Sequence, residues 1–444
     1  MLILSLVLLA LGLMAVVIAG CGSSKDDTTT TAAATATTVA AGTTDTTTAG
    51  STDTTVAGTT DTTVAFNGTF DGPEITIGAL GSMTGSSAMN GAESIWAQKK
   101  AADDINAKGG ILLNGKHSKM VLKYVDDQSD PTQGAAAIEK LIKVEGLKLI
   151  LSTQVTPINL SAAIVAEKYQ ALYQQIITWT DVARTQKWKF CPDLFFSPGA
   201  VGEVPFFIAD KMPAADQPKT WGVLTEDNAD GQGLGGGVKA VAKNHPYVNI
   251  AVYQTYTPGT KDYSSAILKF KQAKCDAIVT LISASDGITF VKQMKEANYA
   301  PKLMMGWKGF WPTEFQQGLG ADSDYILHDG FWSAEEGFPG DTELGAAYSA
   351  ANNGNTSVSV GLPYAQVQIL AMAIEKAGST DPAKVRDQIY GGTFKGTTMG
   401  DVTYDAAGVA DISPLGLQWI GGKRVIIYPG HETDLKLFVA WDKR

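Results

Sequence analysis

Small polar residues concentrate in one short stretch of this 444-residue chain. In "ITIGALGSMTGSSAMNGAES" (75–94), a β-branched run ends at Gly78, and glycine, serine, threonine and asparagine residues then precede a helix-like pattern. Such residues leave main-chain N–H groups and hydroxyls open to a small polar molecule. Such a loop could bind the phosphate of a nucleotide, a substrate in which a bond is broken, or a solute that is bound without reaction.

A dinucleotide site is the first alternative. "GQGLGG", with Gly231, Gly233 and Gly236, fits the GxGxxG spacing and follows a strand-like run. The acidic "EDNAD" before these glycines would repel a pyrophosphate, and the next strand ends without the acid that holds a ribose. Glycines in this position are also typical of close strand–helix packing. The sequence therefore predicts no nucleotide cofactor.

Catalytic and metal sites also lack their usual residues. The chain has no GxSxG or GxxxxGK[ST] motif, and Ser82 and Thr84 have no histidine in a neighbouring predicted loop. Adjacent carboxylates such as Asp126 and Asp127 are more often capping or solvated than catalytic. The four histidines are scattered and no CxxC pair occurs. These residues predict a protein that binds a solute, with no enzymatic activity, cofactor or metal.

Strand-like and helix-like segments alternate twice, which favours an α/β fold with two doubly wound parallel sheets. About 370 residues after the N-terminal region exceed what one core usually serves, so two domains are expected. Ligands of such sheets bind beyond the carboxyl ends of the strands. A later helix (364–378) and β segment (400–430) are expected to complete both units. The first series covers 74–80, 91–110, 119–128, 130–146, 147–153, 158–170 and 171–179; the second covers 220–227, 231–245, 248–256, 262–274, 275–283, 287–299 and 302–307.

The N-terminal region predicts export. Residues 1–20 are almost wholly apolar and lead into Cys21, which indicates a signal peptide or, alternatively, an uncleaved membrane anchor. Residues 22–73 are rich in threonine, alanine, glycine and serine, and we expect a disordered tether. A net charge of -10 argues against a nucleic-acid partner. Cys191 and Cys275 could form a disulfide in an oxidising compartment. A pairing is the less favoured alternative, because we expect the two cysteines in different domains.

Six motifs follow one another along the chain: "IGALGSMTGSSAMNG", "AADDINAKGGI", "DDQSDPTQGAAAIEKLI", "DNADGQGLGGGVKAV", "YTPGTKDYSSAILKFKQAKCDAIV" and "FVKQMKEANYAPKLMMG". In this order and spacing, they resemble class I periplasmic-type solute-binding proteins. The chain is most similar to the branched-chain amino acid and amide receptors of ABC importers. "VIAGC" further resembles the lipobox of bacterial lipoproteins, in which the cysteine is lipidated.

The resemblance implies two lobes joined by three crossovers, which close on a ligand like a hinge. Lobe 1 would be 74–198 plus 333–415, and lobe 2 would be 199–332 plus 416–444. The protein would be a monomer, lipid-anchored outside the cytoplasm, that delivers its ligand to ABC permease subunits and, indirectly, to their ATPase subunits. The same fold also serves sensors that report to a membrane signalling partner.

The resemblance also implies a set of ligand-binding residues. Asp230 and Lys308 stand where amino acid receptors of this family have a tyrosine and a glutamate. Either these two residues pair with each other, or Lys308 faces an anionic or carbonyl group, or it is solvated. We therefore expect a carboxylate or amide without a free ammonium, and the aromatic residues Trp179, Trp307, Phe310 and Trp311 suit a flat solute. The expected ligand-binding residues are Asn90, Thr156, Pro157, Asn159, Ile177, Thr178, Trp179, Asp230, Ala284, Trp307 and Lys308.

Overall fold

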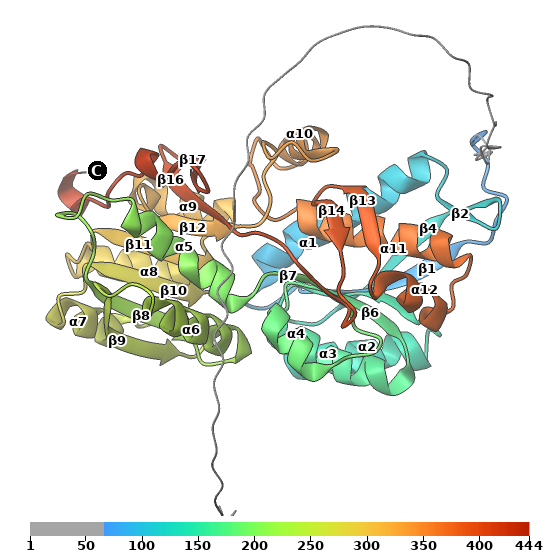
Figure 1. The fold of residues 1–444 in the computed structure, drawn as a ribbon, viewed down its shortest axis with the longest axis horizontal. Coiled ribbons are helices and arrows are strands. Elements are labelled where there is room, and N and C mark those ends of the chain that lie inside the picture. The colour runs from blue at the N-terminus through green and yellow to red at the C-terminus, as the bar shows by residue number, and fades with distance from the viewer. Residues whose placement is uncertain (1–65, 444) are drawn as a thin grey trace, which may run out of the picture. The chain divides into compact units, whose positions relative to one another are not determined.

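Two β-sheets dominate residues 66–443, which are the residues described by the computed structural model (Figure 1). The first sheet has six strands in the order β15-β7-β6-β5-β1-β4, and all neighbouring strands in it run parallel. Its strands are β1 (Ile75–Gly81), β4 (Met120–Asp126), β5 (Leu149–Leu151), β6 (Leu172–Ile176), β7 (Asp193–Phe195) and β15 (Val409–Asp411).

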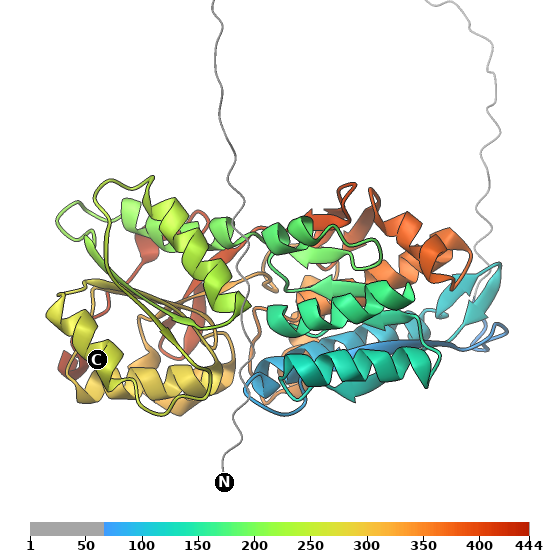
Figure 2. The ribbon, with the colours of Figure 1, turned by 90° about the horizontal axis from the view of Figure 1, so that it is seen from below.

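Helices cover both faces of the first sheet. In β1, Ile77 and Ala79 pack into one core with helices α1 and α11, whereas Leu80 packs into another core with α2 and α3. Figures 1 and 2 show α2 and α3 side by side on one face. The helices of this part are α1 (Ala88–Ala107), α2 (Pro131–Lys143), α3 (Thr156–Tyr169), α4 (Thr180–Gln186), α11 (Gly361–Ala377) and α12 (Pro382–Ile389).

The second sheet has seven strands in the order β17-β16-β12-β11-β10-β8-β9. Its five earlier strands run parallel, and the hairpin β16–β17 is added antiparallel to β12. The strands are β8 (Thr220–Glu226), β9 (Asn249–Tyr256), β10 (Ala277–Ile282), β11 (Leu303–Lys308), β12 (Leu327–Gly330), β16 (Leu415–Ile420) and β17 (Lys423–Tyr428). The helices are α5 (Pro198–Asp210), α6 (Ala229–Ala242), α7 (Ser264–Gln272), α8 (Ala284–Glu296) and α9 (Thr313–Leu319).

The chain passes between the two sheets three times. The passages follow β7, β12 and β15, which lead into α5, α10 and β16 respectively. The expectation that late segments complete both units is confirmed, because β15 joins the first sheet and β16–β17 join the second. The remaining elements are the hairpins β2 (Ile111–Leu113) with β3 (Lys116–Ser118) and β13 (Thr393–Thr397) with β14 (Gly400–Thr403), helix α10 (Asp341–Ala351), and the 3-10 turns Gly320–Ser323, Glu432–Asp434 and Trp441–Lys443.

Residues 66–73, the expected end of the tether, lie against the β2–β3 hairpin. Gly72 N–H donates to the His117 carbonyl at 2.9 Å, and His117 N–H donates to Asp71 Oδ1 at 2.7 Å. The Phe66 ring lies 5.1 Å from the His117 ring. The predicted signal peptide, Cys21 and the rest of the tether fall outside the described residues. Within residues 66–443, no helix combines the length and the apolar character needed to cross a bilayer.

The two cysteines that the structure describes are both free and buried. Cys191 packs in the core between the first sheet and α3, where its thiol lies 3.7 Å from the Ala163 carbonyl. Cys275 packs in a core of the second sheet. The structure therefore shows no disulfide between Cys191 and Cys275. Burial raises the pKa of both thiols.

Helix α2 offers a test of local stability. Asp130 caps it by accepting hydrogen bonds from the Thr132 and Gln133 N–H groups at 2.8 and 2.9 Å, with Pro131 at the first helical position. We expect Asp130→Ala to lower the free energy of unfolding by about 1 kcal/mol, because two main-chain donors lose their partner. Urea unfolding measures this change. Asp103→Ala, at an exposed position of α1, is the control and should change it by less than about 0.5 kcal/mol.

Candidate functional site

A cavity with a volume of about 20 Å³ lies where the carboxyl ends of both sheets' strands meet. The first sheet and its loops contribute Gln154, Thr156, Ile177, Trp179, Phe195 and Phe196. The second sheet with α6 and its loops contributes Asp230, Leu281, Trp307, Lys308, Trp311 and Asp329. This position agrees with the general rule that ligands of open parallel sheets bind beyond the carboxyl ends of the strands.

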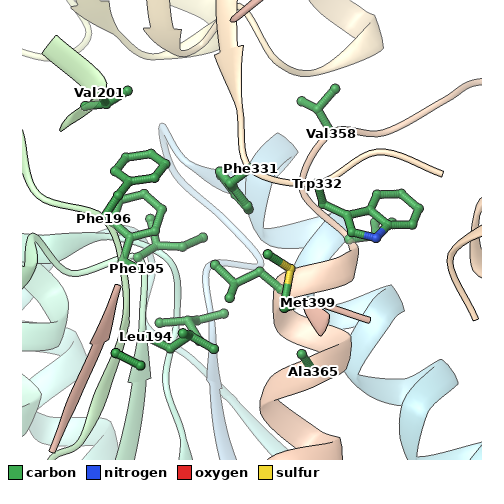
Figure 3. Packing of buried hydrophobic residues seen from close by; sticks show 14 of the residues in the cluster. Leu194, Phe195, Phe196, Val201, Phe331, Trp332, Val358, Ala365 and Met399 are labelled. Atoms are coloured by element: carbon green, nitrogen blue, oxygen red, sulfur yellow. The ribbon is translucent and has the colours of Figure 1, made fainter. Parts of the chain in front are cut away.

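The cavity is too small for an amino acid in this arrangement. A volume of about 20 Å³ is close to the space that one water molecule needs. Aromatic rings occupy the surrounding space: Trp179 lies 5.6 Å from Phe195, and Phe195 stacks on Phe196 at 3.8 Å. Figure 3 shows Phe195 and Phe196 next to each other, with Phe331 facing them. A solute must therefore displace side chains or separate the two sheets to enter.

Two hydrogen bonds connect the two sides of the cavity. The Trp179 indole N–H donates to the Asp230 carbonyl at 3.2 Å, and the Asn90 side-chain amide donates to the Lys308 carbonyl at 3.1 Å. Trp179 also lies directly over Gly233 of α6, where an added Cβ would meet the indole ring at 2.6 Å. Trp179 thus fastens the first sheet's loops to α6.

Strained backbone occurs on both sides of the cavity. Ile177 has φ 56° and Lys308 has φ 65°. A β-branched residue in the left-handed region is an outlier. Such conformations cost about 1–3 kcal/mol each and cluster at ligand clamps and switch regions. Both residues were predicted to bind ligand, and both line the cavity.

The ammonium of Lys308 is held by two buried carboxylates. Its Nζ lies 3.1 and 2.9 Å from the two oxygens of Glu226 and 3.4 Å from Asp230 Oδ2. The side chains of Lys308, Glu226 and Asp230 are 12%, 1% and 9% exposed. Burial acts to lower the pKa of Lys308, but the charges of Glu226 and Asp230 outweigh it and raise the pKa above 10.5. Of the three alternatives left open for Lys308, the structure shows the pair with Asp230, and it adds Glu226, a partner that the sequence analysis missed.

Asp329 is the other carboxyl group of the cavity, and it is fully buried. Burial raises its pKa well above the ordinary value, although a hydrogen bond from the Trp311 indole N–H to Oδ1 opposes this shift. Burial therefore disfavours the ionised form of the Asp329 carboxyl group. The neighbouring His328 is also buried, and burial lowers its pKa to about 3, so its imidazole is uncharged.

Six of the eleven expected residues line the cavity: Thr156, Ile177, Trp179, Asp230, Trp307 and Lys308. Thr156 is the first residue of α3, as expected for a hydroxyl residue that opens this helix. Asn159 and Thr178 lie outside the cavity lining and are bonded to each other at 3.0 Å. Asn159 also donates to the Ile176 carbonyl and accepts from the Tyr173 hydroxyl. Its amide orders the loop after β6 in this arrangement.

The other expected residues occupy supporting positions. Pro157 is in the first turn of α3, and Ala284 is the buried first residue of α8; neither is part of the cavity lining. Asn90, which is also outside the lining, crosses to the Lys308 carbonyl. Phe310, expected near the cleft, instead stacks on Phe315 at 4.3 Å in a core of the second sheet.

Sequence reasoning missed several lining residues. Gln154 lies three residues after β5, Phe195 is the last residue of β7 with Phe196 next to it, and Asp329 lies within β12 of the second sheet. The rule that strand ends carry the site would have pointed to Gln154, whereas nothing in the local pattern distinguishes Asp329 from a solvated acid. Residues 66–443 contain no cluster of three or more His, Cys, Asp or Glu side chains that could hold a metal.

The contact between Trp179 and α6 suggests a conformational test. We expect Trp179→Ala to shift the ligand-free protein toward a wider separation of the sheets, because it removes one hydrogen bond and the ring that covers Gly233. Spin labels are attached at Lys143→Cys on α2 and Leu268→Cys on α7, in a Cys21→Ser background. Pulsed electron paramagnetic resonance then measures the distance between the two labels. Both labelled positions are exposed, while Cys191 and Cys275 are buried. An unchanged distance distribution contradicts this role for Trp179.

Comparisons with known proteins agree with this architecture. The family model described as "Periplasmic binding protein" matches residues 74–413. The chain is 27% identical over 336 residues to Leu/Ile/Val-binding protein homolog 3 of Brucella melitensis, with 76% of this chain and 88% of that protein covered.

Solved structures are similar in fold. The substrate-binding protein LivJ of Streptococcus pneumoniae, in complex with isoleucine, gives a TM-score of 0.69 at 21% identity over 80% of this chain and 100% of that chain. A solute-binding protein of Rhodopseudomonas palustris, in complex with benzoate, gives 0.68 at 17% identity over 83% of this chain and 98% of that chain. The two sheets and the match to most of the described chain lead to one conclusion: the chain belongs to the periplasmic binding protein family, with the class I fold of its Leu/Ile/Val-binding members, and is a solute-binding protein rather than an enzyme.

Proposed function

We propose that this protein is the lipid-anchored, extracytoplasmic substrate-binding component of an ABC importer. Residues 1–21 are the signal peptide with the lipidated Cys21, and residues 22–73 are the tether. Lobe 1 is 74–198 plus 333–415, and lobe 2 is 199–332 plus 416–444. The monomer captures a small solute between the lobes and presents it to membrane permease subunits, whose ATPase partners drive uptake.

The observation that supports this proposal is the cavity with contributions from both sheets. Six lining residues come from the first sheet and its loops and six from the second with α6, while three chain passages connect the two. A ligand that contacts both sides binds the closed arrangement better than an open one, so it shifts the population toward closure. Closure is the signal that a permease can distinguish.

The proposed solute is amino-acid-like, an amide or a carboxylate, with room for a flat apolar group. Trp179, Trp307 and Trp311 supply aromatic walls, and Thr156 opens helix α3 at the edge of the cavity. The similar proteins named above were solved with isoleucine and with benzoate, which span this range of solutes.

Native mass spectrometry of the purified protein without added ligand is the first experiment. We expect a small molecule to be carried through purification and recovered unchanged after long incubation. Isothermal titration with that molecule, and with leucine, isoleucine, valine, their amides and benzoate, then measures affinity. The spin-label pair on α2 and α7 measures closure. If no solute binds and the distance between the labels never shortens, the proposal is wrong.

A further inference from the structure

Three side chains of the cavity carry buried polar atoms that have no hydrogen-bond partner among the described residues. These atoms are both amide atoms of Gln154, the indole Nε1 of Trp307 and Oδ2 of Asp329. The three residues are 5%, 1% and 0% exposed. Leaving such a group unsatisfied costs about 1–3 kcal/mol. Several such atoms around one cavity therefore indicate groups that a bound molecule satisfies.

The hydrogen-bonding types of these atoms are mixed. The indole N–H of Trp307 only donates, whereas the amide of Gln154 both donates and accepts. Oδ2 of Asp329 accepts a hydrogen bond, and it also donates one when the carboxyl group is protonated. A ligand ammonium needs acceptors only and a ligand carboxylate needs donors only. A group with both a carbonyl oxygen and N–H donors matches the mixed set better than either ion.

Charge disfavours a carboxylate at the same place. An ammonium has three N–H donors, and three carboxylate oxygens of Glu226 and Asp230 already lie within 3.4 Å of Lys308 Nζ. Two carboxylates and one ammonium leave this cluster with an excess negative charge. A ligand carboxylate beside it would have no free cation in the cavity, and burying such an unpaired charge is costly.

On the basis of the solute-binding function proposed above, we propose that Gln154, Trp307 and Asp329 recognise the uncharged carboxamide group of a flat apolar solute. The Trp307 indole donates to the amide oxygen, and the amide N–H groups bond to Asp329 and Gln154. The rings of Trp179, Phe195 and Trp311 cover the apolar part. Lys308 holds Glu226 and Asp230 in place and does not contact the solute.

Two matched sets of compounds test the assignment on the full-length protein. Benzamide, benzoate and benzylamine share one ring and differ in charge, and phenylacetamide, phenylacetate and phenethylamine form a second set. Isothermal titration is expected to show that the amide of at least one set binds about tenfold or more tightly than its acid and its amine. A tighter acid would mean that Lys308 is released to the solute, and a tighter amine would mean that an ionised Asp329 binds it; either result overturns the inference.

Substitutions test the individual residues. Asp329→Asn keeps a hydrogen-bonding group of the same shape without a charge and should change the amide affinity by less than about threefold, whereas Asp329→Leu should weaken it about tenfold or more. Gln154→Leu, on the other side of the cavity, tests the inference independently if Asp329→Leu does not fold. Asp262→Asn, at an exposed position just before α7, is the control and should leave the amide affinity unchanged. A loss in Asp329→Asn equal to that in Asp329→Leu contradicts recognition of a neutral group.

The outcome also separates this inference from the proposed function. If none of the six compounds binds, but leucine or the co-purified molecule closes the lobes, the carboxamide assignment is wrong and solute capture stands. If no compound of any class binds and the spin-label distance stays constant, solute capture itself fails.

Discussion

Replacing Lys308 by methionine is expected to lower the free energy of unfolding by about 3–5 kcal/mol, because two buried carboxylates lose their counter-ion. Glu226 and Asp230 both lie within 3.4 Å of Lys308 Nζ and are at most 9% exposed at their side chains. Chemical denaturation at neutral pH measures the loss. Lys292→Met, at an exposed position of α8, serves as the control and should stay within about 0.5 kcal/mol of the unchanged protein.

A second variant identifies the unpaired carboxylates as the cause. Adding Glu226→Gln and Asp230→Asn to Lys308→Met removes both buried charges, so we expect it to recover a large part of the lost stability. No recovery would show that the lysine stabilises the fold through packing of its apolar stem and not through charge.

The same cluster predicts a dependence on alkaline pH. The pKa of Lys308 is raised in the folded protein, so its contribution is fully present below its ordinary pKa of 10.5 and is lost as the pH rises through the higher, folded value. The stability difference between the unchanged protein and Lys308→Met should therefore be constant at neutral pH and shrink only above pH 10.5. A difference that shrinks on acidification from pH 8 to pH 6 would contradict this assignment.

Gly233→Leu is expected to weaken solute binding by roughly 5- to 150-fold, because its side chain forces Trp179 away from α6. An added Cβ would approach the Trp179 indole to 2.6 Å, and overpacking of this kind costs about 1–3 kcal/mol. This overpacking destabilises the closed arrangement, in which the two sides of the cavity meet, and leaves the open arrangement unaffected. Isothermal titration with the co-purified solute measures the loss, and the α2–α7 spin-label distance should lengthen.

Gly236→Leu is the matched control for this prediction. Gly236 lies in the same helix, and an added Cβ there would meet no atom within 4 Å. Both substitutions raise the helix propensity of α6 by a similar amount, so the difference between them isolates the contact with Trp179. Equal affinities in the two variants would show that the sheets do not need to meet at Gly233 when the solute is bound.

The alternation of strands and helices could be predicted from the sequence because residues close together in the chain determine each of these elements. Apolar runs such as 277–282 are buried throughout, and α2 begins at a capping Asp130 with Pro131 behind it. Short elements escaped this reading: β7 has three residues, all buried, and it pairs with β6 on one side and β15 on the other. A three-residue strand carries too little periodicity to be recognised alone.

The position of the site was predictable in the same way, since strand ends of open sheets converge on one edge. Thr156, Ile177 and Trp179 lie there because β5 and β6 end just before them. The role of Lys308 was not predictable to the same degree. Its partner Glu226 closes β8, 82 positions away in the chain, and only the pairing of β8 and β11 with the intervening β10 brings the two side chains within 2.9 Å.

By itself, the sequence determined the two α/β series and the strand ends at which a solute site would form, because apolar periodicity, caps and glycines act over a few neighbouring residues. Only the tertiary structure decided the chemistry of that site. Whether Lys308 is free or neutralised, whether Asp329 is solvated or buried, and whether Trp179 reaches α6 all depend on residues far away in the chain. Charge, burial and contact are properties of the packed environment, and the local pattern of residues does not contain them.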